Sequence, residues 1–309
     1  MLKGPHTMRQ LIVLGLVGLL AQLIDGSLGM AYGVTSTTLL LAAGIAPATA
    51  SAAVHFSEIG TSLVSGISHH KFGNVDWKTV SILAIPGFIG AFAGATFLTS
   101  LSGDAATPWV SGLLLALGVY VIWRFLALGG RRPEFHGRPG VKLLVPMGLV
   151  GGALDSIGGG GWGPVGTTTL LSSGRLEPRK VVGSIDTSEF VVAVGGSLGF
   201  LVALGSSGIE WSIAAALLIG GIIAAPIAAW LVKILPARVL AIAAGGIIIL
   251  TNARTIALAL GASSTTVAVT LAALAAAWIA LIVHAVRVER RTRRTESLAE
   301  AGAEVTTGS

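Results

Sequence analysis

Apolar runs of about 20 residues recur along the chain, separated by short polar or glycine-rich stretches. The long runs are 79–101, 109–128, 178–205, 211–232, 238–260 and 265–286. Each is long enough to cross a hydrocarbon core of about 30 Å as an α-helix. The pattern predicts an all-α, polytopic membrane protein with one membrane domain, residues 1–288. The polar remainder, 289–309, is expected to be a disordered cytoplasmic tail.

A glycine-rich stretch in the middle of the chain interrupts this pattern. The sequence DSIGGGGWGPVGTTTLL, residues 155–171, has six glycines and a proline behind an aspartate. Such residues break helices, and irregular backbone at membrane depth is tolerated only where it is buried in protein or lines a polar cavity. The stretch therefore predicts a broken helix at a functional position.

The same interruption occurs once before, 130 residues earlier. Ten of 27 positions are identical between 18–44 and 148–174, and the later motif HFSE matches DTSE. Paired Asp, Glu and Arg residues at matching positions favour a repeat over chance similarity of two glycine-rich segments. We infer two halves, about 11–128 and 141–260, followed by an extra helix at 265–287.

Basic residues concentrate in loops on one side of the predicted membrane. By the positive-inside rule, the cytoplasmic stretches are 69–78, 129–142, 174–180, 233–238 and 287–294. The stretches expected outside, which lack Lys and Arg, are 102–107, 205–210 and 261–266. Matching helices of the two halves then cross in opposite directions. We therefore expect two inverted repeats, each with a broken-helix hairpin and about three transmembrane helices, and a cytoplasmic C-terminus.

The two interrupted segments, 11–44 and 143–174, leave two arrangements open. In one, both short helices of a segment span the membrane. In the other, the segment is a re-entrant hairpin whose tip lies inside the membrane. Arms of about fifteen residues, such as 11–25, are short for spanning. This favours the hairpin.

The chemistry of the breaks suits an anion. Inverted repeats with interrupted helices place a binding site near the midplane, and half-helix N-termini offer N–H groups and a positive dipole end. The candidate substrate-binding residues at and after the breaks are Gly26, Ser27, Gly29, Thr37, Thr38, His55, Ser57, Gly159, Gly160, Gly161, Thr167, Thr168 and Ser188. The alternative is that the glycines only allow helices to pack closely.

Ionisable residues inside a membrane are functional candidates by default. His55 and Glu58 share a helix face at i, i+3, and an Asp–Glu pair holds the same places in the second half. A carboxyl group buried in protein tends to be neutral and can therefore carry a proton. The predicted proton-coupling residues are Glu58, Glu189, Asp25, Asp155 and Asp186. Interhelical hydrogen bonding is the alternative role.

Two arginines, Arg124 and Arg254, lie at matching positions of the halves and are further candidates for binding substrate. A guanidinium group is a natural partner for an oxyanion. Arg124 lies near the predicted cytoplasmic end of its helix, where snorkelling to lipid headgroups is the alternative. Arg254 lies near the outer end of its helix, where positive charge is disfavoured.

The composition argues against several other classes. The chain has no cysteine, and its net charge of +6 belongs to loops and the tail rather than to a nucleic-acid-binding surface. It has no H-E-x-x-H motif and no recognisable nucleophile elbow. We therefore expect no metal, no cofactor and no enzymatic activity. The expected partners are a small anion and membrane lipid, without nucleic acid, and a homodimer is left open.

The doubled Asp/Gly-rich break, the HFSE and DTSE helices and the two inverted halves resemble the TauE/SafE family of sulfite and organosulfonate exporters. The resemblance covers about residues 10–260. It implies a permease of the bacterial cytoplasmic membrane that moves sulfite, sulfoacetate or related organosulfonates outward. The alternative is an anion channel or another small-anion carrier, although a channel would be expected to show a continuous polar pore lining.

The absence of cysteine allows a direct test of the predicted topology. Single cysteines at Asp104, Ser207 and Ser263 should react with a membrane-impermeant thiol reagent from outside. Cysteines at His136 and Arg291 should not react, because these positions are predicted to be cytoplasmic. Labelling of position 136 from outside would contradict the inverted arrangement.

Overall fold

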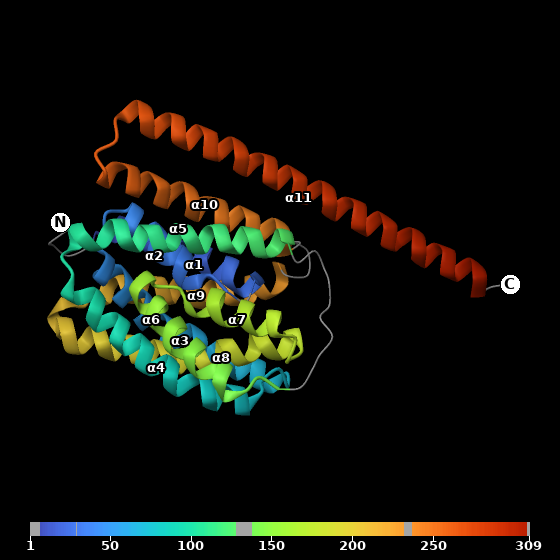
Figure 1. The fold of residues 1–309 in the computed structure, drawn as a ribbon, viewed down its shortest axis with the longest axis horizontal. Coiled ribbons are helices and arrows are strands. Elements are labelled where there is room, and N and C mark those ends of the chain that lie inside the picture. Colours follow the sequence, from blue (N-terminus) through green and yellow to red (C-terminus); the bar gives the residue numbers. More distant parts are fainter. Residues whose placement is uncertain (1–6, 29, 128–137, 232–236, 308–309) are drawn as a thin grey trace.

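The computed structural model describes residues 7–28, 30–127, 138–231 and 237–307 (Figure 1). The described residues form eleven α-helices and one short 3-10 helix, with no strand among them. The α-helices are α1 (Met8–Leu28), α2 (Tyr32–Ala42), α3 (Pro47–Lys71), α4 (Trp77–Ser100), α5 (Gly103–Ala127), α6 (Val141–Gly158), α7 (Trp162–Ser173), α8 (Pro178–Leu204), α9 (Trp211–Leu231), α10 (Ala237–Ala259) and α11 (Ser264–Thr307). The predicted all-α membrane fold is confirmed.

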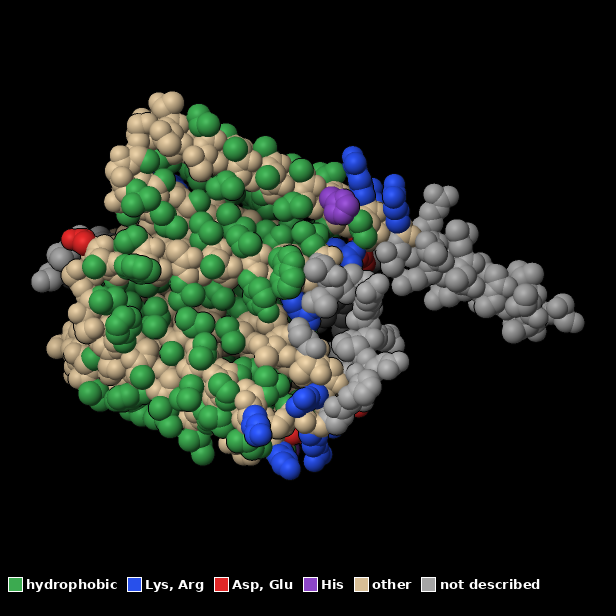
Figure 2. Space-filling view, in the orientation of Figure 1, with side chains coloured by type: hydrophobic (Ala, Val, Ile, Leu, Met, Phe, Trp, Pro, Cys, Tyr) green, Lys and Arg blue, Asp and Glu red, His purple; other side chains and the backbone are tan. Residues whose placement is uncertain are grey.

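Seven of the described helices are long and apolar enough to cross a membrane: α1, α4, α5, α6, α8, α10 and α11. On the face shown in Figure 2 the middle of the bundle carries hydrophobic and other uncharged side chains, and most of the visible Lys and Arg side chains gather at one end. Part of the expected basic loop 129–142, including His136, and most of 233–238 lie outside the described residues. The orientation of the halves relative to the membrane stays a prediction.

Each interrupted segment forms a long helix followed by a short one. In the second segment α7 folds back along α6, since a Cβ added at Gly151 would lie 3.7 Å from a methyl carbon of Val165. The turn begins at Gly159, whose φ of 69° is in the left-handed region that glycine adopts without strain. In the first segment Ala31 has a φ of 107°, a strained value for a residue with a side chain.

The two breaks cross each other at the centre of the bundle. A Cβ at Gly33 would lie 1.8 Å from the carbonyl oxygen of Gly159, and a Cβ at Gly160 would lie 2.0 Å from the amide nitrogen of Val34. On the other side of the crossing, Gly163 packs against Met30. The breaks therefore meet backbone to backbone at these glycines.

Contacts in the two halves correspond to one another. Gly18 of α1 packs against Leu217 of α9, and Gly148 of α6 packs against Leu83 of α4. The first residues of the short helices also make corresponding contacts: Tyr32 lies against Gly221 of α9, and Trp162 lies against Gly87 of α4. Each broken hairpin thus packs against a long helix of the other predicted half.

At the basic end of the bundle the loop between α3 and α4 is fixed to α8. Asp76 caps α4 by accepting a hydrogen bond from the Thr79 amide at 2.9 Å, and its own amide donates to Ser184 Oγ at 2.9 Å. Burial opposes ionisation of Asp76, but the hydrogen bonds from Thr79 and the charges of Arg138 and Lys180 outweigh it and lower its pKa.

The C-terminal segment 289–309 differs from the expected disordered tail, because α11 continues as a helix to Thr307. Arg, Glu and Ala are frequent in this segment, and all three are good helix formers. In Figure 1 this part of α11 extends beyond the bundle. A helix that leaves the membrane can continue without tertiary contacts when its own residues favour the helical state.

The crossing of the breaks predicts a contrast between two glycine-to-alanine variants. Gly33→Ala should lower stability by about 3 kcal/mol or prevent folding, since its Cβ would meet backbone that cannot move cheaply. Gly112→Ala should raise stability by about 0.5–1 kcal/mol, because nothing lies within 4 Å of its added Cβ in the middle of α5. The melting temperatures of the purified variants test this. Equal melting temperatures would contradict the close approach.

Candidate transport site

The two aspartates that precede the breaks cap the short helices that follow them. Asp25 Oδ1 accepts a hydrogen bond from the Tyr32 amide at 3.1 Å, and Asp155 Oδ1 accepts one from the Trp162 amide at 2.9 Å. A carboxylate at a helix N-terminus satisfies a free N–H group and complements the helix dipole. The Tyr32 and Trp162 amides, which the sequence suggested for an anion, are therefore occupied by the protein's own carboxylates.

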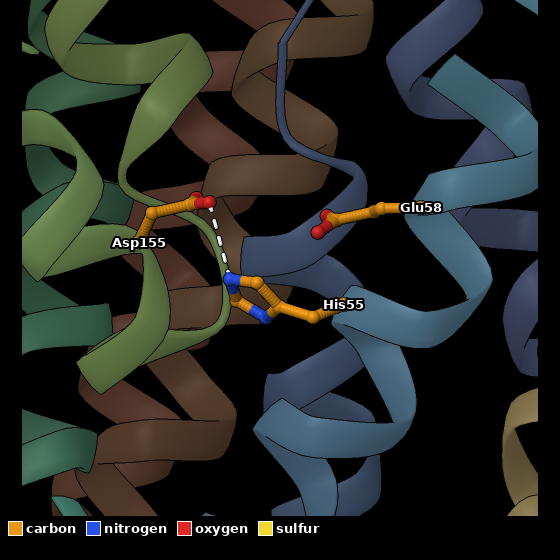
Figure 3. Close-up of side chains that lie close together, drawn as sticks. All are labelled: His55, Glu58 and Asp155. Carbon is orange, nitrogen blue, oxygen red and sulfur yellow. Dashed lines mark ion pairs between the residues drawn. The ribbon is translucent and has the colours of Figure 1, made fainter. Parts of the chain in front are cut away.

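The second oxygen of Asp155 faces a buried histidine. His55 Nε2 lies 3.3 Å from Asp155 Oδ2 and 3.1 Å from Ser156 Oγ (Figure 3). The His55 ring is fully buried, and its edge meets Phe200 with ring centroids 5.8 Å apart. A neighbouring hydrogen bond, from Ser51 Oγ to the Ser156 carbonyl at 2.6 Å, fixes α3 against the end of α6.

The hydrogen bond of the other ring nitrogen, Nδ1, indicates where the His55 ring carries a proton. Nδ1 lies 2.9 Å from the Ser51 carbonyl oxygen, which can only accept, so Nδ1 carries a proton. A neutral ring would then turn the Nε2 lone pair toward a carboxylate oxygen, and the two acceptors would repel. The contact between His55 Nε2 and Asp155 Oδ2 is attractive when a proton, carried by either atom, lies between them.

Glu58 stands one turn further along α3, and its carboxylate points toward this pair (Figure 3). Its residue is 1% exposed, and neither carboxylate oxygen has a hydrogen-bond partner among the described residues. The nearest nitrogen or oxygen atoms of His55, Glu58 and Asp155 all lie within 4.8 Å of one another. This spacing is close enough for the three groups to share a bound cation, whether proton or metal.

A polar cavity lies next to Glu58, beside the first break. It has room for about one water molecule and opens between α1, α2, α3 and α8. Its lining side chains all carry oxygen: Gln22, Asp25, Tyr32, Glu58, Thr61, Ser62, Ser65, Asp186 and Glu189. Four of these are carboxylic acids, and none is basic. The cavity suits protons or cations in its present form.

The acidic pair of the second half lies on the opposite wall of this cavity. Ser65 Oγ donates to Asp186 Oδ2 at 2.8 Å, and Ser62 Oγ donates to Glu189 Oε2 at 3.1 Å. His69 Nε2 also contacts Asp186 Oδ2, at 3.2 Å. The structure thus brings four of the five predicted proton-coupling residues around one cavity, and it joins the fifth, Asp155, to His55.

Most of the predicted substrate-binding hydroxyls are engaged within the protein. They bond as follows: Thr37 to the Gly159 carbonyl, Thr38 to Asn252, Ser57 to the Val54 carbonyl and to Tyr32, Thr168 to the Pro164 carbonyl, and Ser188 to the Ile185 carbonyl. By contrast, the buried hydroxyls of Thr35 and Thr167 have no hydrogen-bond partner among the described residues. These two retain donors for another molecule.

The remaining candidates are not part of the buried cluster. Arg254 is exposed, although Asn252 two residues earlier is buried against Thr38. Arg124 is partly buried near the end of α5. Gly161 packs tightly against the Asp155 amide. Gly29 lies outside the described residues, as do the side-chain environments of Gly26 and Ser27.

Sequence reasoning missed three polar residues of α3: Ser62, Ser65 and His69. With His55 and Glu58 they are spaced by three, four, three and four residues, which places all five on one helix face. This spacing is visible in the sequence. It was overlooked because Ser62 and Ser65 have no polar counterparts in the second half, so comparing the repeats did not reveal them.

The profile of the family described as "Sulfite exporter TauE/SafE" matches residues 14–255. The chain belongs to the TauE/SafE family. It is 54% identical over 258 residues to "Probable membrane transporter protein YtnM" of Bacillus subtilis (strain 168), in an alignment that covers 81% of this chain and 83% of that relative. No solved structure matches the chain significantly. The fold and the family together make this a membrane transporter.

For a TauE/SafE transporter named after an anion, the charge of the cavity is unexpected. The sequence suggested a site of N–H groups, hydroxyls and arginine, whereas the described cavity is lined by Asp25, Glu58, Asp186 and Glu189 without a basic side chain. An isolated ionised carboxylate is costly to bury. Several ionised carboxylates cannot share this space unless protons or other cations neutralise them.

The double role of Asp155 leads to a graded prediction. Asp155→Ala removes the cap of α7 and the partner of His55, and the lost cap alone should cost about 1–2 kcal/mol. Asp155→Asn keeps an oxygen for the Trp162 amide and should lose less. Asp25→Asn and Asp25→Ala are the matched pair at the first break. Thermal unfolding of the four variants tests this, and equal losses for Asn and Ala would exclude a capping role.

Proposed function

We propose that this TauE/SafE transporter exports small sulfur-containing anions, such as sulfite, sulfoacetate or related organosulfonates, and that their movement is coupled to protons. The observation that carries the substrate class is the family match over residues 14–255. The observation that supports coupling is the acidic cavity, where Asp25, Glu58, Asp186 and Glu189 have no basic neighbour in the lining.

Electrostatic repulsion links the anionic substrate to the proposed proton coupling. Two like charges 4 Å apart repel by about 4 kcal/mol at an effective dielectric constant of about 20. An anion therefore binds beside Glu58 or Glu189 only after their carboxylates have taken up protons. Protons and anion then bind together, each raising the affinity for the other.

Hydroxyl groups at the breaks provide the donors for the anion in this proposal. Thr35 lies in the first turn of α2 and Thr167 lies in α7, and both hydroxyls are unpaired among the described contacts. The glycines of the breaks are packed against backbone, so an anion reaches their amides only if the breaks move apart. Arg254 is exposed and would contribute at an entrance rather than at the cavity.

We further propose that the protein lies in the bacterial cytoplasmic membrane with its C-terminus inside. The basic end of the bundle seen in Figure 2, from which α11 extends, is then the cytoplasmic end. In this orientation the loop held by Asp76 lies at the cytoplasmic surface, and Asp104 lies outside.

The coupling predicts that anion affinity rises as pH falls. The probe is an alkyl sulfonate, because its charge does not change over the working range. Its affinity, measured by thermal shift of the purified protein, should rise by up to about tenfold per pH unit for each coupled proton. Glu58→Gln should flatten this dependence while binding persists, because glutamine is permanently neutral.

Glu177→Gln is the matched control, since Glu177 is exposed and paired with Arg179. It should behave as the unchanged protein. Sulfonate affinity that stays constant or falls on acidification would contradict the coupling. Sulfite flux in proteoliposomes that rises linearly without saturation would indicate a channel. A folded protein that binds no sulfur oxyanion would exclude the substrate class.

A further inference from the structure

The polar face of α3 leads from the interior of the protein to its basic end. It consists of His55, Glu58, Ser62, Ser65 and His69, and from here on these five residues are called the α3 polar face. α8 runs antiparallel beside it, since Gly66 lies against Thr187 whereas His55 lies against Gly196. Thus the α3 polar face passes Asp186 and Glu189 on its way inward.

The outer end of this path is His69. Its side chain is 23% exposed and lies in the last turn of α3, beside His70 and Lys71. Its Nε2 is 3.2 Å from Asp186 Oδ2, which also accepts the hydrogen bond from Ser65. A partly exposed imidazole in contact with a less exposed carboxylate can take a proton from water and pass it inward.

The middle of the path is the acidic cavity. Asp186, Glu189 and Glu58 all line it, and Ser62 holds Glu189 from the α3 side. A single water molecule in this small polar cavity can bridge carboxyl groups that do not touch. Glu58 has both oxygens free of partners among the described residues, so it is the acceptor at which a proton arriving through the cavity can stay.

The inner end is the His55–Asp155 pair. Glu58 points toward this pair (Figure 3), and the contact between His55 Nε2 and Asp155 Oδ2 needs a proton between the two atoms. A proton passed from Glu58 to this pair can take that place. Because the other oxygen of Asp155 caps α7, the proton arrives at the carboxylate that holds the second break together.

The second half does not offer an equivalent path to the opposite end. The residues of α8 that correspond to Ser62, Ser65 and His69 are Ala193, Gly196 and Phe200. All three lack a proton-transferring group, and Phe200 is fully buried against His55. Access through these two helices is therefore one-sided.

We propose that the α3 polar face, with Asp186 and Glu189, is a one-sided proton route from His69 to a proton-binding site at Glu58 and the His55–Asp155 pair. In each passage His69 takes one proton from water at the basic end, and one proton is bound at the inner site. The proposal rests on the proton coupling proposed above and adds its entrance, its direction and its inner binding site.

The charged and titratable groups that act on this route come from five elements. They are Asp25 of α1, Tyr32 of α2, His55, Glu58 and His69 of α3, Asp155 of α6, and Asp186 and Glu189 of α8. Apart from the two histidines these groups are acidic. Protons, rather than protein cations, neutralise the route.

The test measures proton uptake without any transported anion. The full-length protein in lipid nanodiscs is acidified rapidly, and infrared absorption of protonated carboxyl groups is followed in time. Glu58→Gln should remove part of this signal. His69→Ala should slow its appearance by about a hundredfold or more, the range for loss of a positioned proton-transfer group, and added imidazole should restore the rate.

His70→Ala is the matched control, because His70 is exposed and packs on Trp77 rather than on Asp186. It should leave the rate unchanged. The route is wrong if His69→Ala takes up protons as fast as the unchanged protein, or if imidazole fails to rescue a folded variant.

Two further outcomes would overturn the inner site. One is an infrared signal that does not change in Glu58→Gln. The other is a metal ion, detected by elemental analysis in equimolar amount in the purified protein and lost in Glu58→Gln, because a metal would then neutralise the cluster. Sulfonate binding is measured separately, so failure of the substrate proposal leaves this result interpretable, and failure of the route leaves the substrate proposal standing.

Discussion

The backbone contact between the two broken helices is the constraint from which the rest of the centre follows. Gly33 meets Gly159, and Gly160 meets Val34, at distances that exclude any side chain at the three glycines. Polar backbone at this depth has no water to satisfy it, so each break needs an internal acceptor. Asp25 and Asp155 provide it, and the crossing therefore brings two carboxylates into the middle of an apolar bundle.

Once these carboxylates are at the centre, charge becomes the next constraint. Asp155 has a histidine opposite its second oxygen, whereas Asp25 shares a cavity with Glu58, Asp186 and Glu189. Burying a carboxylate without a partner is costly, and the usual response is to bind a proton. A cluster of this kind is poorly suited to structural support alone, because it would be more stable as apolar residues of similar volume.

Helices α3 and α8 occupy matching places in the two halves but carry different residues on the faces that meet. The breaks, their capping aspartates and the packing of Tyr32 and Trp162 correspond in the two halves. The faces of α3 and α8 beyond the central pairs do not correspond, since one is polar and the other carries Phe200. The one-sided proton route proposed above rests on this difference between α3 and α8.

The sequence by itself determined the class of protein, the repeat, the places of both breaks and the acidic pairs. These features depend on local chemistry: the length of apolar runs, the helix-breaking effect of glycine and proline, and spacing along one helix. The full α3 polar face was also present in the sequence as spacing. Its role could not be inferred from the sequence, because serines are common in helices and the carboxylates that face these serines come from another helix.

Only the tertiary structure decided which polar groups are free. Both aspartates bind amides seven residues further along the chain, which occupies donors that the sequence suggested for an anion. Arg254 is exposed because the rotation of α10 about its axis is set by its packing on α5 and α11, and that rotation is not encoded in any local pattern. The acidic cavity arises in the same way. Its carboxylates come from α1, α3 and α8, and their distances depend on how the three helices pack together.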